Sequence, residues 1–156
     1  MPRAALFVAA ALAAAGLTSG PAAACDIEPV RLNFAPGSTA LSADGKEGLD
    51  FYADLFPQYG PGRIMRLTAH TDTVGSAQRN RALAQARALA ARAYLIGKGV
   101  PAGKIEIQNF GEERSAIALG DGRTAAEHRF VQVDILKANE ARKGARARLG
   151  VSPCHG

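Results

Sequence analysis

The chain has 156 residues, of which 47% are hydrophobic and 21% charged, and its formal net charge at pH 7 is +5. This length accommodates one packed domain and excludes two large ones. Residues 25–136 contain thirteen charges of each sign, so the basic excess comes from Arg3 and residues 137–156. Nucleic acid binding needs a patterned basic patch with stacking aromatics, so a short basic tail does not indicate it. The tail favours only a weak attraction to anionic polymers or lipids.

Residues 1–24 have the layout of a secretory signal peptide. Arg3 gives a basic start, an apolar run extends to Leu17, and three alanines precede Cys25. This order is typical of a cleaved export signal, and the alternative is an uncleaved segment that spans a bilayer. We therefore expect an exported protein in the periplasm, with or without attachment to the outer membrane.

The two cysteines, Cys25 and Cys154, stand near the two ends of the chain that cleavage would leave. In an oxidising compartment this position favours a disulfide, which would stabilise the fold by about 4 kcal/mol in the chain-entropy model. Lipidation of Cys25 is an alternative, because Ala-Ala-Ala-Cys looks like a degenerate lipobox, and two free thiols are another. A lipidated Cys25 would anchor the chain to the outer membrane.

The first half of the domain alternates between strand and helix patterns. Residues 30–34 alternate apolar and polar side chains before a Pro-Gly-Ser turn, which predicts a strand. Ser42 is a suitable N-cap for a helix over residues 43–56, which Pro57 ends. Residues 63–70 alternate again and predict a second strand with at least one buried face.

The second half continues the same alternation. Residues 71–76 form a turn, and residues 77–96 contain no helix breaker and predict a long helix that ends at the following glycines. Residues 104–110 predict a third strand, residues 111–127 a long polar loop, and residues 130–136 the last strand. The order is β-α-β-α-β-loop-β. Crossover connections place the helices on one face of a mixed sheet, so the predicted fold is an α/β two-layer sandwich.

Three polar side chains mark a candidate site. Asp72 lies in the turn before the second helix, while Asn80 and Arg87 are seven residues apart and project from one side of that helix. The helix N-terminus adds backbone N–H groups that favour an anion. A carboxylate beside a guanidinium suits a zwitterionic amino-acid end. Spacing alone favours simpler interpretations, in which Asp72 pairs with Arg87 or caps the helix.

Residues 68–88 resemble the signature of the OmpA-like C-terminal domain, written as GHTD, then G, N, LS and RA. Further similarities are found in residues 34–41, in residues 94–100, at Gly111-Glu112 and in residues 127–133. The resemblance covers residues 31–136. With the signal peptide and the basic tail described above, the expected domain organisation is a signal peptide at 1–24, a short segment at 25–30, an OmpA-like domain at 31–136 and a basic tail at 137–156.

The resemblance also implies a function, which is non-catalytic binding of peptidoglycan in the cell envelope through the diaminopimelate of the stem peptide. Asp72 would pair with the ligand ammonium and Arg87 with its carboxylate. Asn80 would order the loop or touch the peptide, and Thr71 would line the rim, as would the turn around Gly37 and Ser38.

The sequence departs from the family pattern at three places. Ala69 replaces a Gly and Ala84 replaces a Ser, both with little change in size. His128-Arg129-Phe130 replaces Asn-Arg-Arg, which leaves Arg129 alone to contact ligand near the expected groove. The alternative function is therefore a structural or assembly module that has this fold and weak or no affinity for peptidoglycan.

Nothing in the sequence indicates an enzyme, a cofactor or a metal. His70, Asp72, His128 and His155 lack the close, repeated spacing of a zinc site. We also find no nucleophile elbow, no Cys-His arrangement in the folded region and no motif for a catalytic carboxylate pair. Peptidoglycan is thus the expected partner, nucleic acid is not, and protein partners are not identified.

Overall fold

The computed structural model describes residues 28–115, 122 and 124–138. The predicted signal peptide, both cysteines and the basic tail from residue 139 onwards lie outside the described residues. Six long elements follow one another in the predicted order: β1 (Val30–Asn33), α1 (Ala43–Leu55), β2 (Arg63–His70), α2 (Ala77–Gly97), β3 (Ile105–Gly111) and β4 (Phe130–Lys137). Short 3-10 helices lie between them: η1 (Phe56–Tyr59), η2 (Ala102–Lys104) and η3 (Ala126–His128).

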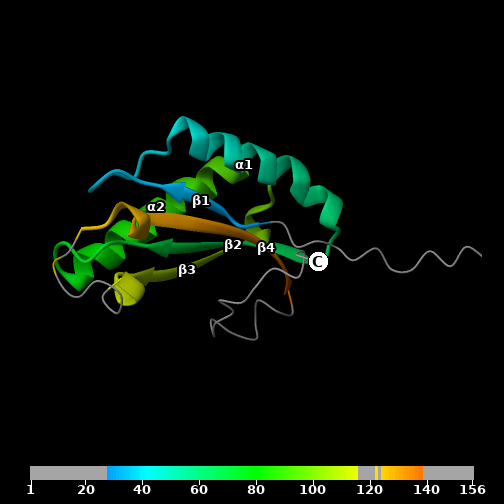
Figure 1. The fold of residues 1–156 in the computed structure, drawn as a ribbon. Coiled ribbons are helices and arrows are strands. Elements are labelled where there is room, and N and C mark those ends of the chain that lie inside the picture. Colours follow the sequence, from blue (N-terminus) through cyan, green and yellow to red (C-terminus); the bar gives the residue numbers. More distant parts are fainter. Residues whose placement is uncertain (1–27, 116–121, 123, 139–156) are drawn as a thin grey trace, which may run out of the picture.

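The four strands form one mixed sheet in the order β1-β4-β2-β3. β4 is antiparallel to both β1 and β2, while β2 and β3 are parallel. Both α1 and α2 lie on the same side of this sheet (Figure 1). The predicted two-layer α/β sandwich is confirmed.

The core lies between the helices and one face of the sheet. Met65, Leu67 and Ala69 alternate along β2, have no exposed surface and pair with Ile135, Val133 and Val131 of β4. Alternate residues of a strand point to opposite faces, so this pattern defines the buried face. α2 packs on it with small fully buried residues, Ala84, Ala88 and Ala91, which let the helix approach the strands closely.

The helix ends differ slightly from the predicted ones. α1 ends at Leu55 instead of residue 56, because Pro57 has no N–H group to continue the helical hydrogen bonds and the chain tightens into η1. α2 continues to Gly97, one residue further than predicted, before Gly99 adopts a φ of 96°. Within the described residues, no helix is both long and apolar enough to span a membrane.

A β-bulge lies where β2 and β3 end. The register pairs Ala69 with Asn109 but His70 with Gly111, which leaves Phe110 as the extra residue. Gly111 has a φ of 53°, and a Cβ atom there would lie 3.3 Å from the Cα of Arg81 on α2. The bulge thus brings the end of β3 against α2, and the N–H of Thr71 donates to the Gly111 carbonyl at 2.8 Å.

The strand directions separate the two ends of the domain. In the β1/β4 pair, Val30 lies opposite Val133 and Asn33 lies opposite Phe130. β4 then extends beyond the start of β1 to Lys137. β1 therefore begins and β4 ends at one end of the sheet, and the residues that follow β1, β2 and β3 gather at the other.

Candidate functional site

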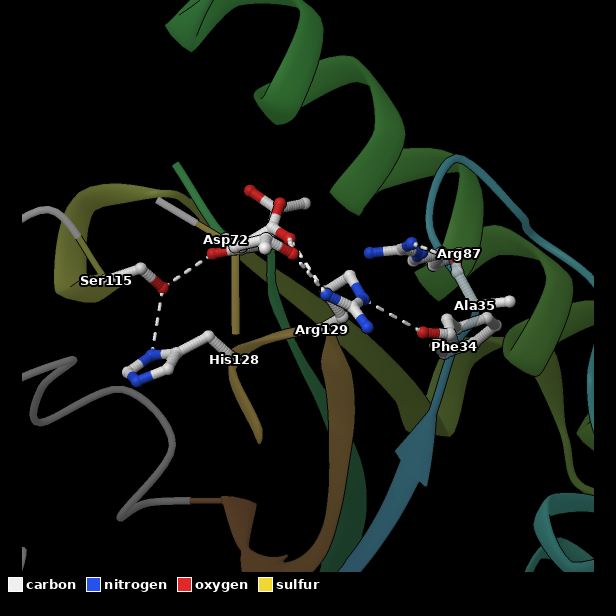
Figure 2. A network of polar contacts seen from close by, with 9 residues as sticks. Phe34, Ala35, Asp72, Arg87, Ser115, His128 and Arg129 are labelled. Atoms are coloured by element: carbon white, nitrogen blue, oxygen red, sulfur yellow. Dashed lines mark hydrogen bonds and ion pairs between the residues drawn. The ribbon is translucent and has the colours of Figure 1, made fainter. Parts of the chain in front are cut away.

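Asp72 lies in the loop after β2, is 8% exposed and pairs with Arg129. Its Oδ2 atom accepts hydrogen bonds from Nη1 of Arg129 at 3.0 Å and from the hydroxyl of Thr124 at 3.1 Å. The same Nη1 atom donates to Thr124 at 2.9 Å, and Nε of Arg129 donates to the Phe34 carbonyl at 3.3 Å. Figure 2 shows the Arg129 guanidinium between Asp72 and Phe34. Arg129 thus joins the loop after β2 to the end of β1.

Arg87 is completely buried, and two backbone carbonyls hold it in place. Nε donates to the carbonyl of Ser38 at 2.8 Å and Nη2 to that of Ala35 at 3.0 Å. The guanidinium carbon lies 5.0 Å from the ring centroid of Phe34, which is within the range of a cation–π interaction. Burial lowers the pKa of Arg87, the charge of Asp72 opposes this shift, and the charge of Arg129 adds to it.

Two buried polar atoms of the site have no hydrogen-bond partner among the described residues: Nη1 of Arg87 and Oγ1 of Thr71. Thr71 has no exposed surface and precedes Asp72 in the loop. A buried donor without an acceptor costs free energy. Such a donor suits a site that takes an acceptor from another molecule.

Asn80 and Ser38 support the site from its edges. The Nδ2 atom of Asn80 donates to the carboxylate of Glu112, so Asn80 joins α2 to the segment after β3 and not to Asp72. Ser38 follows Gly37, which turns the chain with a φ of 65° and places the Ser38 carbonyl against Arg87. The expected role of Asn80, which is to order the loop or touch the peptide, stays a prediction.

His70 lies on the sheet face opposite the helices, between two aromatic rings. Its centroid is 5.3 Å from that of Phe110 and 4.7 Å from that of Phe130, and the guanidinium groups of Arg114 and Arg31 cover these outer rings. Burial lowers the pKa of His70 to about 4, and the charges of Arg114, Arg31 and His128 add to the effect. His70 is therefore neutral at pH 7 and contributes to packing.

Sequence reasoning missed Thr124 and Ser115. The hydroxyl of Ser115 donates to the Thr71 carbonyl at 2.5 Å and lies 3.1 Å from Nδ1 of His128 (Figure 2). Both residues belong to the region predicted as a long polar loop, and no periodic pattern marks them. In the part of the chain that the structure describes, no group of three His, Cys, Asp or Glu side chains is arranged to hold a metal ion.

The structure brings Thr71, Asp72, Arg87 and Arg129 to one end of the sheet, with Asn80 nearby. The two simpler interpretations of Asp72 both fail in this geometry. Asp72 pairs with Arg129 instead of Arg87, and the cap of α2 is Ser76, whose side chain accepts from the N–H of Arg79. Together, the site holds two arginine charges and one carboxylate on a framework of β-strand ends.

Comparison with known proteins identifies the family. Residues 33–129, well over half of the chain, match the model of the OmpA family. The chain therefore belongs to the OmpA family.

Two curated relatives are both named peptidoglycan-associated lipoprotein. The one from Rhizobium meliloti (strain 1021) is 32% identical over 91 residues, which are 58% of this chain and 51% of the relative. The one from Pseudomonas aeruginosa is 33% identical over 101 residues, which are 64% of this chain and 58% of the relative. The chain thus spans between half and three fifths of the length of these two relatives.

Solved structures agree with this fold. The crystal structure of the peptidoglycan-associated lipoprotein from Burkholderia pseudomallei has a TM-score of 0.60 and 27% identity over 68% of this chain and 89% of that chain. The C-terminal domain of Helicobacter pylori MotB has a TM-score of 0.58 and 19% identity over 75% of this chain and 91% of that one. At that identity, the likeness to MotB shows a shared fold only.

Proposed function

We propose that this chain binds peptidoglycan in the bacterial cell envelope, through the diaminopimelate of the stem peptide and without catalysing a reaction. The observation that carries the proposal is the buried guanidinium of Arg87, whose Nη1 atom has no acceptor among the described residues and lies near the charges of Asp72 and Arg129. Membership of the OmpA family and relatives named peptidoglycan-associated lipoprotein support it.

The fixed guanidinium of Arg87 suits a carboxylate ligand. The carbonyls of Ser38 and Ala35 already hold Nε and Nη2, so Nη1 is the donor left for a ligand. A charge-assisted hydrogen bond from a preorganised donor is stronger than one between neutral groups. The free amino-acid end of diaminopimelate supplies a carboxylate for Arg87 and an ammonium for Asp72.

Binding requires an exchange of partners. Arg87 has no exposed surface, and Asp72 is already paired with Arg129. We infer that the ligand ammonium replaces Arg129 at Asp72 and that Arg129 then turns toward the ligand carboxylate. Two guanidinium groups and one carboxylate give the site a net positive charge, which complements a ligand with more carboxylates than ammonium groups.

A second function has one observation in its favour. Asp72 is satisfied by Arg129 and Thr124 without any ligand, as expected for a structural ion pair. A structural or assembly module with weak or no affinity for peptidoglycan would need nothing more. The unpaired Nη1 atom of Arg87 favours the binding function over this alternative.

The proposed location is the periplasm, reached by export, with outer-membrane attachment if Cys25 is lipidated. The names of the relatives support a place in the envelope. A protein that only binds the wall sediments with it and leaves it intact, whereas an enzyme would release soluble muropeptides. Analysis of the supernatant by chromatography separates these two outcomes.

Cosedimentation with purified peptidoglycan that contains diaminopimelate tests the proposal. Asp72→Ala and Arg87→Ala should each weaken binding by about tenfold or more, because each removes a charge-assisted contact. Arg92→Ala is the matched control, since Arg92 lies on the same helix and donates to the exposed Ala102 carbonyl instead of to a group of the site. Circular dichroism must show that all variants are folded.

Arg87→Lys gives a sharper test of the geometry. An ammonium lacks the planar fork that holds two carbonyls and a carboxylate at once, so Lys should not restore full binding. Equal binding by Arg87→Lys and the unsubstituted chain would contradict the proposed contact. If the unsubstituted chain does not sediment with peptidoglycan at all, the structural alternative is correct.

A further inference from the structure

Ser115 and His128 connect the two sides of the candidate site. Ser115 is 1% exposed, and its Oγ atom lies between the carbonyl of Thr71 and Nδ1 of His128. Thr71 precedes Asp72, and His128 precedes Arg129, so each end of this chain of contacts is one residue from the Asp72–Arg129 ion pair.

The direction of these hydrogen bonds follows from counting protons. A serine hydroxyl has one hydrogen, and Ser115 gives it to the Thr71 carbonyl, which can only accept. The Oγ atom can therefore only accept from His128, so Nδ1 must carry a hydrogen. Either the neutral Nδ1–H form or the charged ring meets this requirement, whereas the neutral Nε2–H form does not.

We propose that His128 and Ser115 are positioning residues for the candidate site, with His128 as an obligatory hydrogen-bond donor. The chain of contacts from His128 to Ser115 to Thr71 holds the loop that bears Asp72 against the segment that bears Arg129. The effect on ligand binding rests on the proposed function, while the hydrogen-bond direction and the order of the loop do not.

Two substitutions of His128 have nearly the same shape, and together they distinguish the loss of the hydrogen-bond donor from a change in side-chain volume. The Nδ1 atom of His is attached to Cγ, as is the Nδ2 atom of Asn, so His128→Asn keeps a donor in the same place. His128→Leu places a methyl group there and has no donor. We expect His128→Leu to weaken binding to purified peptidoglycan by about threefold to tenfold, and His128→Asn to change it by less than about twofold.

Ser115→Ala tests whether the two residues act together. It should weaken binding as much as His128→Leu does, and the double variant should bind no worse than Ser115→Ala, because the contact of His128 is already lost. Additive losses in the double variant would overturn the proposal. Equal behaviour of His128→Asn and His128→Leu would overturn it as well.

Two measurements on the full chain do not need a ligand. Nitrogen-15 NMR should show the neutral His128 ring with its hydrogen on Nδ1, and the Nε2–H form would refute the proposal. Hydrogen exchange at the Thr71 amide, which is bonded to Gly111, should accelerate in His128→Leu and not in His128→Asn. If peptidoglycan binding is absent throughout, the proposed function fails, and these two measurements still decide the positioning role.

Discussion

Asp72 has two arginines near its charge and forms its ion pair with Arg129. The two side chains are each 11% exposed, so the pair is largely shielded from water. Arg87 instead satisfies two carbonyls at the turn after β1. The two arginines therefore differ in what they stabilise: Arg87 fixes the turn, and Arg129 neutralises Asp72.

We predict that Arg129→Ala lowers the free energy of unfolding by about 1–3 kcal/mol at pH 7, because it leaves the shielded Asp72 carboxylate without its cation. Urea denaturation measures the change. Lys46→Ala, at an exposed position of α1, should change stability by less than about 0.5 kcal/mol. In an Asp72→Ala background the effect of Arg129→Ala should be much smaller, and an unchanged effect would show that the ion pair is not its cause.

The lowered pKa of His70 predicts that the stability of the fold depends on pH. The pKa of its folded form is lowered to about 4 from the ordinary histidine value of 6.5. Between these values the unfolded chain binds more protons than the folded one, so the stability that this residue contributes is full above pH 6.5 and is lost as the pH falls toward 4. The loss should be at most about 3 kcal/mol.

Urea denaturation at pH 7 and at pH 4.5 measures this dependence. His70→Gln removes the titrating ring and should flatten the stability profile between the two values, although its overall stability will be lower. Lys46→Gln, at an exposed position of α1, is the control and should leave the profile as steep as in the unsubstituted chain. An equally steep profile in His70→Gln would mean that other groups cause the dependence.

At the scale of elements, the alternation of apolar residues predicted every strand and both long helices, because each pattern is local. The strand order β1-β4-β2-β3 is not local and did not follow from it. The same limit applies to the site. Asp72, Arg87 and Arg129 were predicted as a ligand set, but the pairing of Asp72 with Arg129 depends on residues 57 positions apart. Ser115 and Thr124 lie in a region without periodicity, so only the folded chain reveals their contacts.

The bulge at the end of β3 also depends on long-range packing, and Gly111 is its most constrained residue. Gly111→Ala should lower stability by about 2–4 kcal/mol, because the φ of 53° strains the new residue and its Cβ atom would lie 3.3 Å from the backbone of Arg81. Gly37→Ala is the matched control: it has a φ of 65° and no atom within 4 Å of its Cβ position.

Thermal or urea unfolding distinguishes the two glycine variants. Gly37→Ala introduces backbone strain alone and should lower the free energy of unfolding by about 1–2 kcal/mol. The difference between the stability losses of the two variants then measures the cost of placing a Cβ atom where β3 and α2 approach closely. Equal losses would mean that α2 moves aside without cost.

At the scale of the whole molecule, the site is assembled from segments that are distant in sequence. Arg87 bonds to carbonyls 49 and 52 residues away, and Arg129 bonds to one 95 residues away. Contacts of this kind form only when the strands around them are paired. Ligand binding is therefore expected to be lost together with the fold, and not in separate steps.

The pairing of Cys25 with Cys154 stays a prediction, because both residues lie outside the described part. A disulfide would make the exported, unreduced chain two hydrogen atoms lighter than the reduced one and block alkylation of both thiols. Cys154→Ser should then lower stability by up to about 4 kcal/mol. A mass increase at Cys25 that corresponds to acyl chains would instead identify a lipid anchor.

The position of the start of β1 and the end of β4, away from the site, has a mechanical consequence. Val30 and Lys137 lie toward the end of the sheet opposite Asp72, so a pull between an anchored terminus and a wall-bound ligand runs along the strands. β1 and β4 would then be loaded in shear, and the hydrogen bonds of their four paired residues would resist together. A pull applied from one end alone would peel these bonds apart one after another. The proposed site thus lies at the end of the sheet from which a pull loads β1 and β4 in shear.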